Sequence, residues 1–286
     1  MAETVGPHHI VQIPPERRVV LNFQDLASGG PTMYALLEVD VTAPRQAMEA
    51  YKARTGERLS FTGYLVYCLG RAVDEDKSVQ AYRKGRNQLV QFDDVDVGMM
   101  IERQFGATRV PSGYVVRRVN HKTFMEVHQE IRRVQHTQTS PRQGFPAWLR
   151  VYQALPGLVQ DALNGIIRSV KRRNPVGAWV ASVGTVGVTA VGMFGSGGGW
   201  GIAPVSHTLC LIVGGIVRKP VVVADRIEAR DILNLTVAFD HAIVDGAPAA
   251  RFVTRLVSLI ESADGLDTDG LVGADAPGRS AAPVRV

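Results

Sequence analysis

The sequence predicts an α/β fold, and three observations support this class. Strand patterns with a period of two alternate along the chain with apolar stripes at helical spacing. The clearest unit, residues 233–260, joins one strand directly to one helix. The chain has 286 residues, of which 45% are hydrophobic and 21% are charged, and this is enough for a sizeable core.

Residues 233–260 organise the rest of the prediction. The letters LNLTVAFD alternate β-forming residues with small ones, which predicts a strand ending near Asp240. An amphipathic helix follows, with Pro248 in its first turn, where a missing N–H is tolerated. Reactive side chains are often placed where a rigid strand ends, so His241 and Asp245 are candidate site residues. One histidine and one carboxylate are too few ligands for a metal site, and as a bare pair they are most simply a surface contact.

The first half of the chain predicts further strands and two helices. Residues 33–41 read as a strand, after which Thr42 is predicted to cap a helix that Gly56 ends. Residues 61–73 are apolar nearly all round, which predicts a buried helix. The Lys-Gly-Arg-Asn sequence at 84–87 predicts a hairpin turn.

The remaining elements follow the same two periods. Strands are predicted at 95–99 and 113–119, and Thr123 then precedes a helix over 124–134. Residues 183–191 interleave valine with glycine and threonine, which predicts a strand that something approaches closely. Residues 208–217 predict a buried strand.

The segment 138–176 has apolar residues at helical spacing and a basic end. Three interpretations remain open. The segment is a helical lid or packing layer, or the wall of an apolar pocket whose basic end meets anionic groups of a ligand. In the third, residues 148–173 lie on a membrane surface.

Two motifs resemble a known family. The sequence HAIVDG resembles the H-x-x-x-D-G active-site motif of the acyltransferase subunits of 2-oxoacid dehydrogenase complexes, relatives of chloramphenicol acetyltransferase. Residues 184–192 resemble the family segment G-T-F-T-I-S-N-L-G. The resemblance covers roughly 33–262 and departs at 138–176, where the family has a shorter link. It implies a two-layer α/β sandwich of the chloramphenicol acetyltransferase type, with a mixed sheet covered by helices.

The resemblance also implies a reaction. An acyl group moves from a coenzyme A thioester to a thiol, hydroxyl or amine, with His241 as general base and the hydroxyl of Thr189 as donor to the oxyanion. Asp245 is expected to shape the site, with Arg17 or Arg18 as its guessed partner. The family implies a homotrimer in which His241 of one subunit meets Thr189 of its neighbour.

Three further residues are expected to contact substrate. Gly246 belongs to the His-Asp-Gly motif, and Ala190 stands where the family often has asparagine. Trp200 lies in a glycine-rich turn, 195–201, and is expected to border the pocket. This turn is not a phosphate-binding loop, because it lacks the Lys-Ser/Thr pair that opens the following helix.

The predicted organisation is one catalytic domain over 31–262, preceded by an arm (1–30) and followed by a disordered tail (263–286). No lipoyl domain and no partner-binding domain is expected, so the catalytic fold stands alone. The net charge of +5 is modest and no long basic run occurs, which disfavours nucleic acid and suits anionic ligands such as coenzyme A. We expect no metal and no permanently bound cofactor.

Cys68 and Cys210 are isolated and no signal peptide is apparent, so a cytoplasmic protein without disulfides is expected. No apolar run approaches the ~20 residues that span a bilayer. Two competing functions remain: a non-catalytic trimeric subunit that binds acyl thioesters, or a pocket recruited for another reaction on a lipid- or polyketide-like substrate. The intact motif favours acyl transfer, whereas Ala190 and the segment 138–176 favour an altered substrate.

Overall fold

The structure is a computed structural model of the chain. It describes residues 30–105, 108–136, 178–190 and 197–266, with a few positions between 155 and 169. The predicted arm and most of the segment 138–176 lie outside the described residues.

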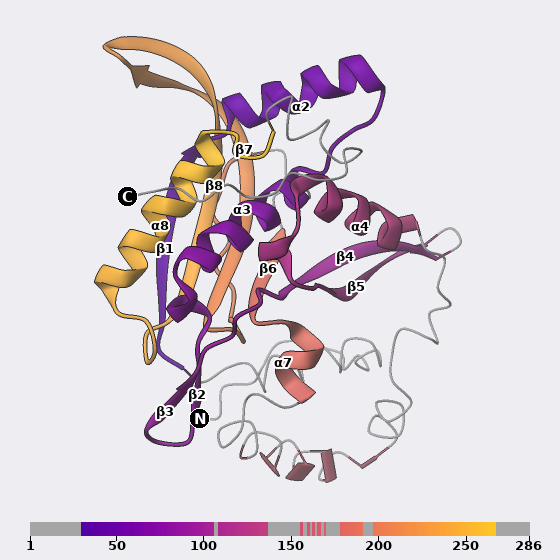
Figure 1. Cartoon of the computed structure of the whole chain (residues 1–286), viewed down its shortest axis with the longest axis vertical. Helices are drawn as coiled ribbons and strands as arrows, with labels where there is room; N and C mark the ends of the chain where they lie inside the picture. Colours follow the sequence, from indigo (N-terminus) through magenta and orange to yellow (C-terminus); the bar gives the residue numbers. More distant parts are fainter. Residues whose placement is uncertain are drawn as a thin grey trace, which may run out of the picture.

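A six-stranded mixed sheet forms the centre of the molecule (Figure 1), and its strand order is β1-β8-β7-β6-β4-β5. The pairs β1/β8, β7/β8 and β4/β5 are antiparallel, while β6 runs parallel to both β4 and β7. The strands are β1 (Thr32–Asp40), β4 (Val97–Phe105), β5 (Thr108–Val116), β6 (Val186–Ala190), β7 (Leu209–Val223) and β8 (Arg226–Asp240). The predicted α/β class with a mixed sheet is confirmed.

Helices cover one face of this sheet, which we call the inner face (Figure 1). The covering helices are α2 (Thr42–Thr55), α3 (Phe61–Glu75), α4 (Phe124–His136) and α8 (Gly246–Glu261), whereas the end of the short helix α7 (Ala178–Val183) lies against Gly98 on the opposite face. Two single turns, η1 (Lys77–Gln80) and η2 (Val119–His121), and the hairpin β2 (Tyr82–Lys84)–β3 (Gln88–Val90) complete the described elements. Among the described residues, no helix is long and apolar enough to cross a membrane.

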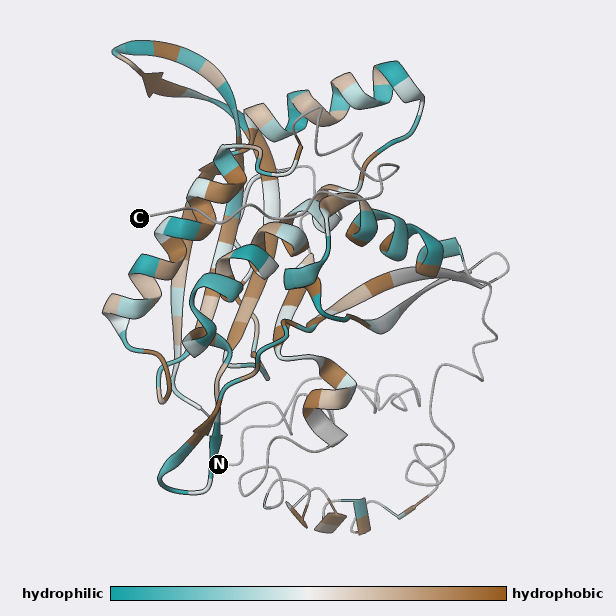
Figure 2. Ribbon diagram, in the orientation of Figure 1, coloured by the Kyte–Doolittle hydropathy of each residue, from teal (hydrophilic) through white to brown (hydrophobic). Residues whose placement is uncertain are grey.

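The strand alternation sorts side chains between the two faces. Leu211 and Leu235 point inward and pack with α3, α4 and α8 in one core. Figure 2 shows α4 largely in teal and α2 with teal and pale residues interspersed, whereas the central strands are largely brown or pale. The opposite or outer face carries small side chains together with a few larger ones such as Ile212, and the segment 197–207 crosses it. In that crossing, Ala203 and Val205 pack against the cluster of Cys210, Ile212 and Ala238.

Several predicted elements differ in detail from the structure. Thr42 is the first residue of α2 rather than its cap, and its hydroxyl accepts a hydrogen bond from the Asp231 N–H instead. Gly56 ends α2 in the left-handed region, with a φ of 77°, as predicted. Val183 was assigned to a strand but closes the short helix α7.

The strand predicted at 208–217 is part of a longer strand, β7, which pairs with an equally long β8. The far end of this hairpin projects beyond the other strands (Figure 1). At the other boundary, the body extends past the predicted start of the tail, because Leu266 is buried in the core. The tail beyond 266 lies outside the described residues.

Candidate active site

His241 directly follows the last residue of β8. Its backbone N–H donates to the Pro31 carbonyl at 2.7 Å, which fixes the chain as it leaves the sheet. Its ring Nδ1 lies 3.1 Å from the carbonyl oxygen of Val244. Because a carbonyl can only accept, the neutral ring carries its proton on Nδ1 and leaves Nε2 as the basic nitrogen. The residue is exposed, so Nε2 is available to a substrate.

Asp245 occupies the N-cap position of α8, and Gly246 is the first residue of that helix. The Asp245 side chain makes no capping hydrogen bond and, within the described part of the chain, no ion pair. A carboxylate at this position is stabilised by the positive end of the helix dipole. Arg17 and Arg18 lie outside the described residues, so their pairing with Asp245 stays a prediction.

Thr189 points to the outer face of β6. Its neighbours Val186 and Val188 face the helices, so the alternation places Thr189 and Gly187 on the opposite side. Thr189 is half-buried and pairs with Ile212 of β7. The structure therefore places the predicted oxyanion donor on the face that the core does not use.

One chain does not bring Thr189 and His241 together. Thr189 is in register with Ile212, and Ile212 is in register with Thr236 of β8. His241 lies five residues beyond Thr236 along the chain. Strand spacing and rise place the two Cα atoms roughly 19 Å apart. The two candidate groups are therefore in reach of one substrate only if they come from different subunits.

Two of the predicted substrate-binding residues lie away from Thr189. Ala190 faces inward and packs against the core, so it does not share a face with Thr189. Trp200 is 41% exposed, and its Nε1–H donates to the carbonyl of Leu37 at 2.8 Å. Leu37 belongs to the edge strand β1, three strands away from β6.

His207 is a neighbour of Thr189 that sequence analysis missed. Its Nε2 lies 3.1 Å from the carbonyl of Val183 at the end of α7, and its Nδ1 lies 3.2 Å from Ser206 Oγ. The ring rests on Gly187, where a Cβ atom would stand 2.8 Å from Nδ1. Glycine at this position of β6 was the available signal, because it marks a close approach.

Gly98 of β4 lies beside Gly187 and admits the end of α7. A Cβ atom at Gly98 would stand 1.8 Å from the carbonyl oxygen of Val183, a distance that no side chain allows. Because neither glycine has a side chain, the end of α7 packs on Gly98 and the His207 ring packs on Gly187. We call this pair of glycines the shelf. This shelf lies one pleat, about 7 Å, from Thr189.

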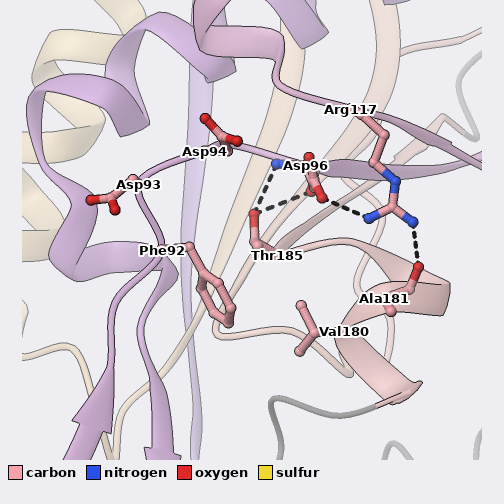
Figure 3. A pocket seen from close by; sticks show the side chains of 8 residues that line it. All are labelled: Phe92, Asp93, Asp94, Asp96, Arg117, Val180, Ala181 and Thr185. Carbon is pink, nitrogen blue, oxygen red and sulfur yellow. Dashed lines mark hydrogen bonds and ion pairs between the residues drawn. The ribbon is translucent and has the colours of Figure 1, made fainter.

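A cavity of about 430 Å³ opens at the start of β4 and β6 (Figure 3). Arg117 is held in it by Asp96, with 2.6 Å between Nη1 and Oδ2, and also donates to the Ala181 carbonyl. The lining residues are Phe92, Asp93, Asp94, Asp96, Arg117, Val180, Ala181 and Thr185. Three carboxylates against one paired guanidinium make this cavity a poor match for phosphate groups.

Neither cysteine is suited to act as a nucleophile. Cys210 lies on the outer face and Cys68 in α3, and both are buried and unpaired. Burial raises the pKa of each thiol to about 12, so both are protonated at neutral pH. The candidate reactive groups that remain are the imidazole of His241 and the hydroxyl of Thr189.

Comparisons with known proteins agree with this description. The chain is 23% identical over 268 residues to the "lipoamide acyltransferase component of branched-chain alpha-keto acid dehydrogenase complex" of Bacillus subtilis, covering 92% of this chain and 54% of that protein. It is also 23% identical over 251 residues to the succinyltransferase component of the yeast 2-oxoglutarate dehydrogenase complex, covering 85% of this chain and 45% of the relative. The chain thus spans about half the length of these relatives.

Solved structures share the fold. A probable dihydrolipoamide acetyltransferase from Listeria monocytogenes matches with a TM-score of 0.64 and 20% identity, covering 91% of this chain and 97% of that one. The Azotobacter vinelandii dihydrolipoamide acetyltransferase matches with a TM-score of 0.62 and 17% identity, covering 92% and 98%. The predicted architecture is thereby confirmed.

A family model assigns the chain. The model of the 2-oxoacid dehydrogenases acyltransferase (catalytic domain) matches residues 9–142 and 176–266. The unmatched residues between them lie within the segment 138–176, where the sequence departs from the family motifs. Since well over half of the chain is matched, it belongs to the 2-oxoacid dehydrogenase acyltransferase family and carries its catalytic domain.

Proposed function

We propose that this chain transfers an acyl group between coenzyme A and the thiol of a dihydrolipoyl group, with His241 as general base. Family membership supports the reaction class. The relatives named as lipoamide acyltransferase and dihydrolipoyllysine succinyltransferase components support the two thiols. The observation that carries the proposal is the Val244 carbonyl on Nδ1 of His241, which leaves Nε2 free to accept a proton.

The step proceeds as follows in the direction of coenzyme A acylation. Nε2 of His241 takes the proton of the coenzyme A thiol, and the thiolate sulfur attacks the carbonyl carbon of the acyl-dihydrolipoyl thioester. A new C–S bond forms and the carbonyl oxygen becomes an oxyanion, to which the Thr189 hydroxyl donates. The old C–S bond then breaks, and the departing dihydrolipoyl sulfur takes the proton back from the imidazolium.

The proposed site lies between subunits of a homotrimer. The separation of roughly 19 Å between Thr189 and His241 in one chain supports a shared site. The projecting hairpin supports a contact surface, because its paired residues Val222 and Ile227 are 70% and 78% exposed. We also infer a cytoplasmic location, which two buried, unpaired thiols support.

The direct test is turnover by His241→Ala with acyl-coenzyme A and dihydrolipoamide, measured as thiol release. We expect a loss of roughly 10²- to 10⁴-fold, because a general base is removed. His136→Ala at the end of α4 is the matched control and should leave turnover unchanged. Near wild-type turnover by His241→Ala would refute the proposed base. Binding of acyl-coenzyme A by wild type without any turnover would instead favour the accessory-subunit hypothesis.

A mixing experiment tests the shared site. Thr189→Val should lower turnover by roughly 10²- to 10³-fold, as for loss of an oxyanion donor. Co-refolded His241→Ala and Thr189→Val chains should regain activity, since some interfaces then pair two intact halves. Light scattering should show a trimer or a multiple of one. A monomer at micromolar concentration, or no regained activity in a confirmed mixed trimer, would contradict the shared site.

A further inference from the structure

The outer face around Thr189 is a row of four side chains on four adjacent strands. Val188 pairs with Met99 of β4, so the same register places Met100 beside Thr189. Ile212 lies on the other side of Thr189, and Thr236 lies beyond it. Neighbouring side chains on one face have Cβ atoms roughly 5 Å apart, which is within reach of a group bound at Thr189.

Met100 differs from the residues around it on β4. Val97, Met99 and Ile101 are buried against the helices, whereas Met100 is 55% exposed. A thioether chain is unbranched and adaptable, so it can fold over ligands of different shapes. The core does not require an apolar side chain at this outward position.

The other sides of Thr189 are bordered by Ile212 and by the His207 ring. Ile212 is 1% exposed and packs with Cys210 in the cluster beneath the segment 197–207. His207 covers Gly187 at one end, with its Nε2 engaged by the Val183 carbonyl. In this row and in the adjacent row of Gly98, Gly187, Cys210 and Ala238, every side chain is uncharged.

From these contacts we infer that Met100 forms the wall of the acyl pocket, and that the site takes short, apolar aliphatic acyl groups. This inference rests on the proposed function, because it places the thioester carbonyl at Thr189. With the oxygen held by that hydroxyl, the first carbons of the acyl chain lie within reach of the Met100 side chain. Among the described residues, these two rows offer no cationic side chain to a carboxylate-bearing acyl group, which would be desolvated there.

The test compares acetyl-, butyryl-, isovaleryl- and succinyl-coenzyme A on the full chain. Each methylene buried against an apolar wall raises kcat/KM by about fourfold. We expect isovaleryl to exceed acetyl by roughly tenfold or more in wild type, and succinyl to be the poorest substrate. Met100→Ala should lower the isovaleryl-to-acetyl ratio by about tenfold. Met100→Lys should raise the succinyl-to-isovaleryl ratio by at least that factor.

Leu89→Ala is the matched control, because Leu89 is also 55% exposed but lies on the distant hairpin β2–β3. It should change neither ratio. Equal ratios in wild type and Met100→Ala, or succinyl as the best substrate, would overturn the inference. Calorimetric binding of non-reactive thioether analogues of the same acyl groups provides a second readout. Absent turnover would then refute the proposed function, while the analogue affinities would still decide the role of Met100.

Discussion

The inner face of the sheet carries leucine, valine and phenylalanine beneath three helices, whereas the outer face of the same strands carries glycine, threonine, cysteine and an exposed methionine. Val188 and Thr189 are adjacent in the chain, yet one lies in the core and the other faces the proposed substrate. The strand period of two is the physical cause, since it turns neighbouring side chains to opposite faces. Along β6, alternate residues therefore contribute to core packing and to the proposed reaction.

This division makes the outer face free to carry small and polar groups. Glycine at 98 and 187 would weaken an ordinary strand, but here it seats α7 and the His207 ring. Core packing on the inner face compensates for the loss. Truncating a buried inner-face residue should therefore lower the free energy of unfolding far more than truncating an exposed outer-face residue.

The largest expected effect on stability comes from Leu235→Ala. Leu235 is fully buried on the inner face of β8, so its truncation leaves a cavity and should cost about 2–5 kcal/mol in the free energy of unfolding. Leu36→Ala is the matched variant, because Leu36 lies on the outer face next to Thr236 and is 49% exposed. It should cost at most about 0.5 kcal/mol. Urea denaturation measures both, and equal losses would remove the distinction between the faces.

Gly98→Ala probes the shelf on the outer face. Its Cβ would stand 1.8 Å from the Val183 carbonyl oxygen, so α7 must move, at a cost of about 1–3 kcal/mol. Turnover should fall as well, because α7 leads directly into the strand that carries Thr189. Gly113→Ala on β5 is the control, since no atom lies within 4 Å of its added Cβ. An unchanged melting temperature and turnover in Gly98→Ala would contradict this account of the shelf.

Thr236→Val should raise stability. The Thr236 hydroxyl is fully buried on the outer face and has no hydrogen-bond partner among the residues that the structure describes. Replacing it with a methyl group of similar size removes an unsatisfied polar group, and we expect a gain of about 1 kcal/mol. Denaturation measures the gain and thiol release measures turnover. A destabilised variant would show that this hydroxyl is satisfied in solution, and a stable variant with reduced turnover would assign it to the reaction.

The smallest effect is expected from the surface of the helical layer. Arg255 of α8 donates two hydrogen bonds of 2.7 Å to Glu75 of α3, and these bonds lower the pKa of the Glu75 carboxyl. A lowered pKa means that the stabilisation is present above the unfolded pKa of glutamate and is lost as the pH falls through the folded value.

Both side chains are 46% exposed, so the pair should contribute less than about 1 kcal/mol. Glu75→Gln should therefore differ from wild type by this small amount at neutral pH, and the difference should shrink as the pH falls through the lowered pKa of Glu75. Unfolding measured at pH 7 and at pH 3 tests this expectation. A difference that persists in acid would show that the contact is not electrostatic.

Much of the fold could be predicted because its signals are local. The strand that ends at Asp240 and the helix that follows are encoded by a period of two and then of 3.6 within 28 residues. The hairpin at Gly85 and the end of α2 at Gly56 follow from backbone angles that glycine tolerates, with φ values of 65° and 77°. Helix α7 was missed because six residues carry too little periodicity to be distinguished from a strand.

The site could be predicted only in part. The motif placed His241 at the end of β8, and Thr189 was assigned to a strand by its valine neighbours. The same alternation could have shown that Thr189 and Ala190 face opposite sides, so both cannot border one pocket. Trp200 could not be placed from sequence, because its partner on β1 is 163 residues away.

By itself the sequence determined the elements, the family and the residue types available for acyl transfer, since these depend on short-range patterns. Only the tertiary structure decided that Met100 stands beside Thr189, that His207 covers Gly187, and that Thr189 and His241 of one chain are far apart. Each of these depends on the register between strands that are distant in sequence. A strand pattern that repeats every two residues gives the face of each side chain, but leaves the choice of partner strand and of its register to the packing of the whole sheet.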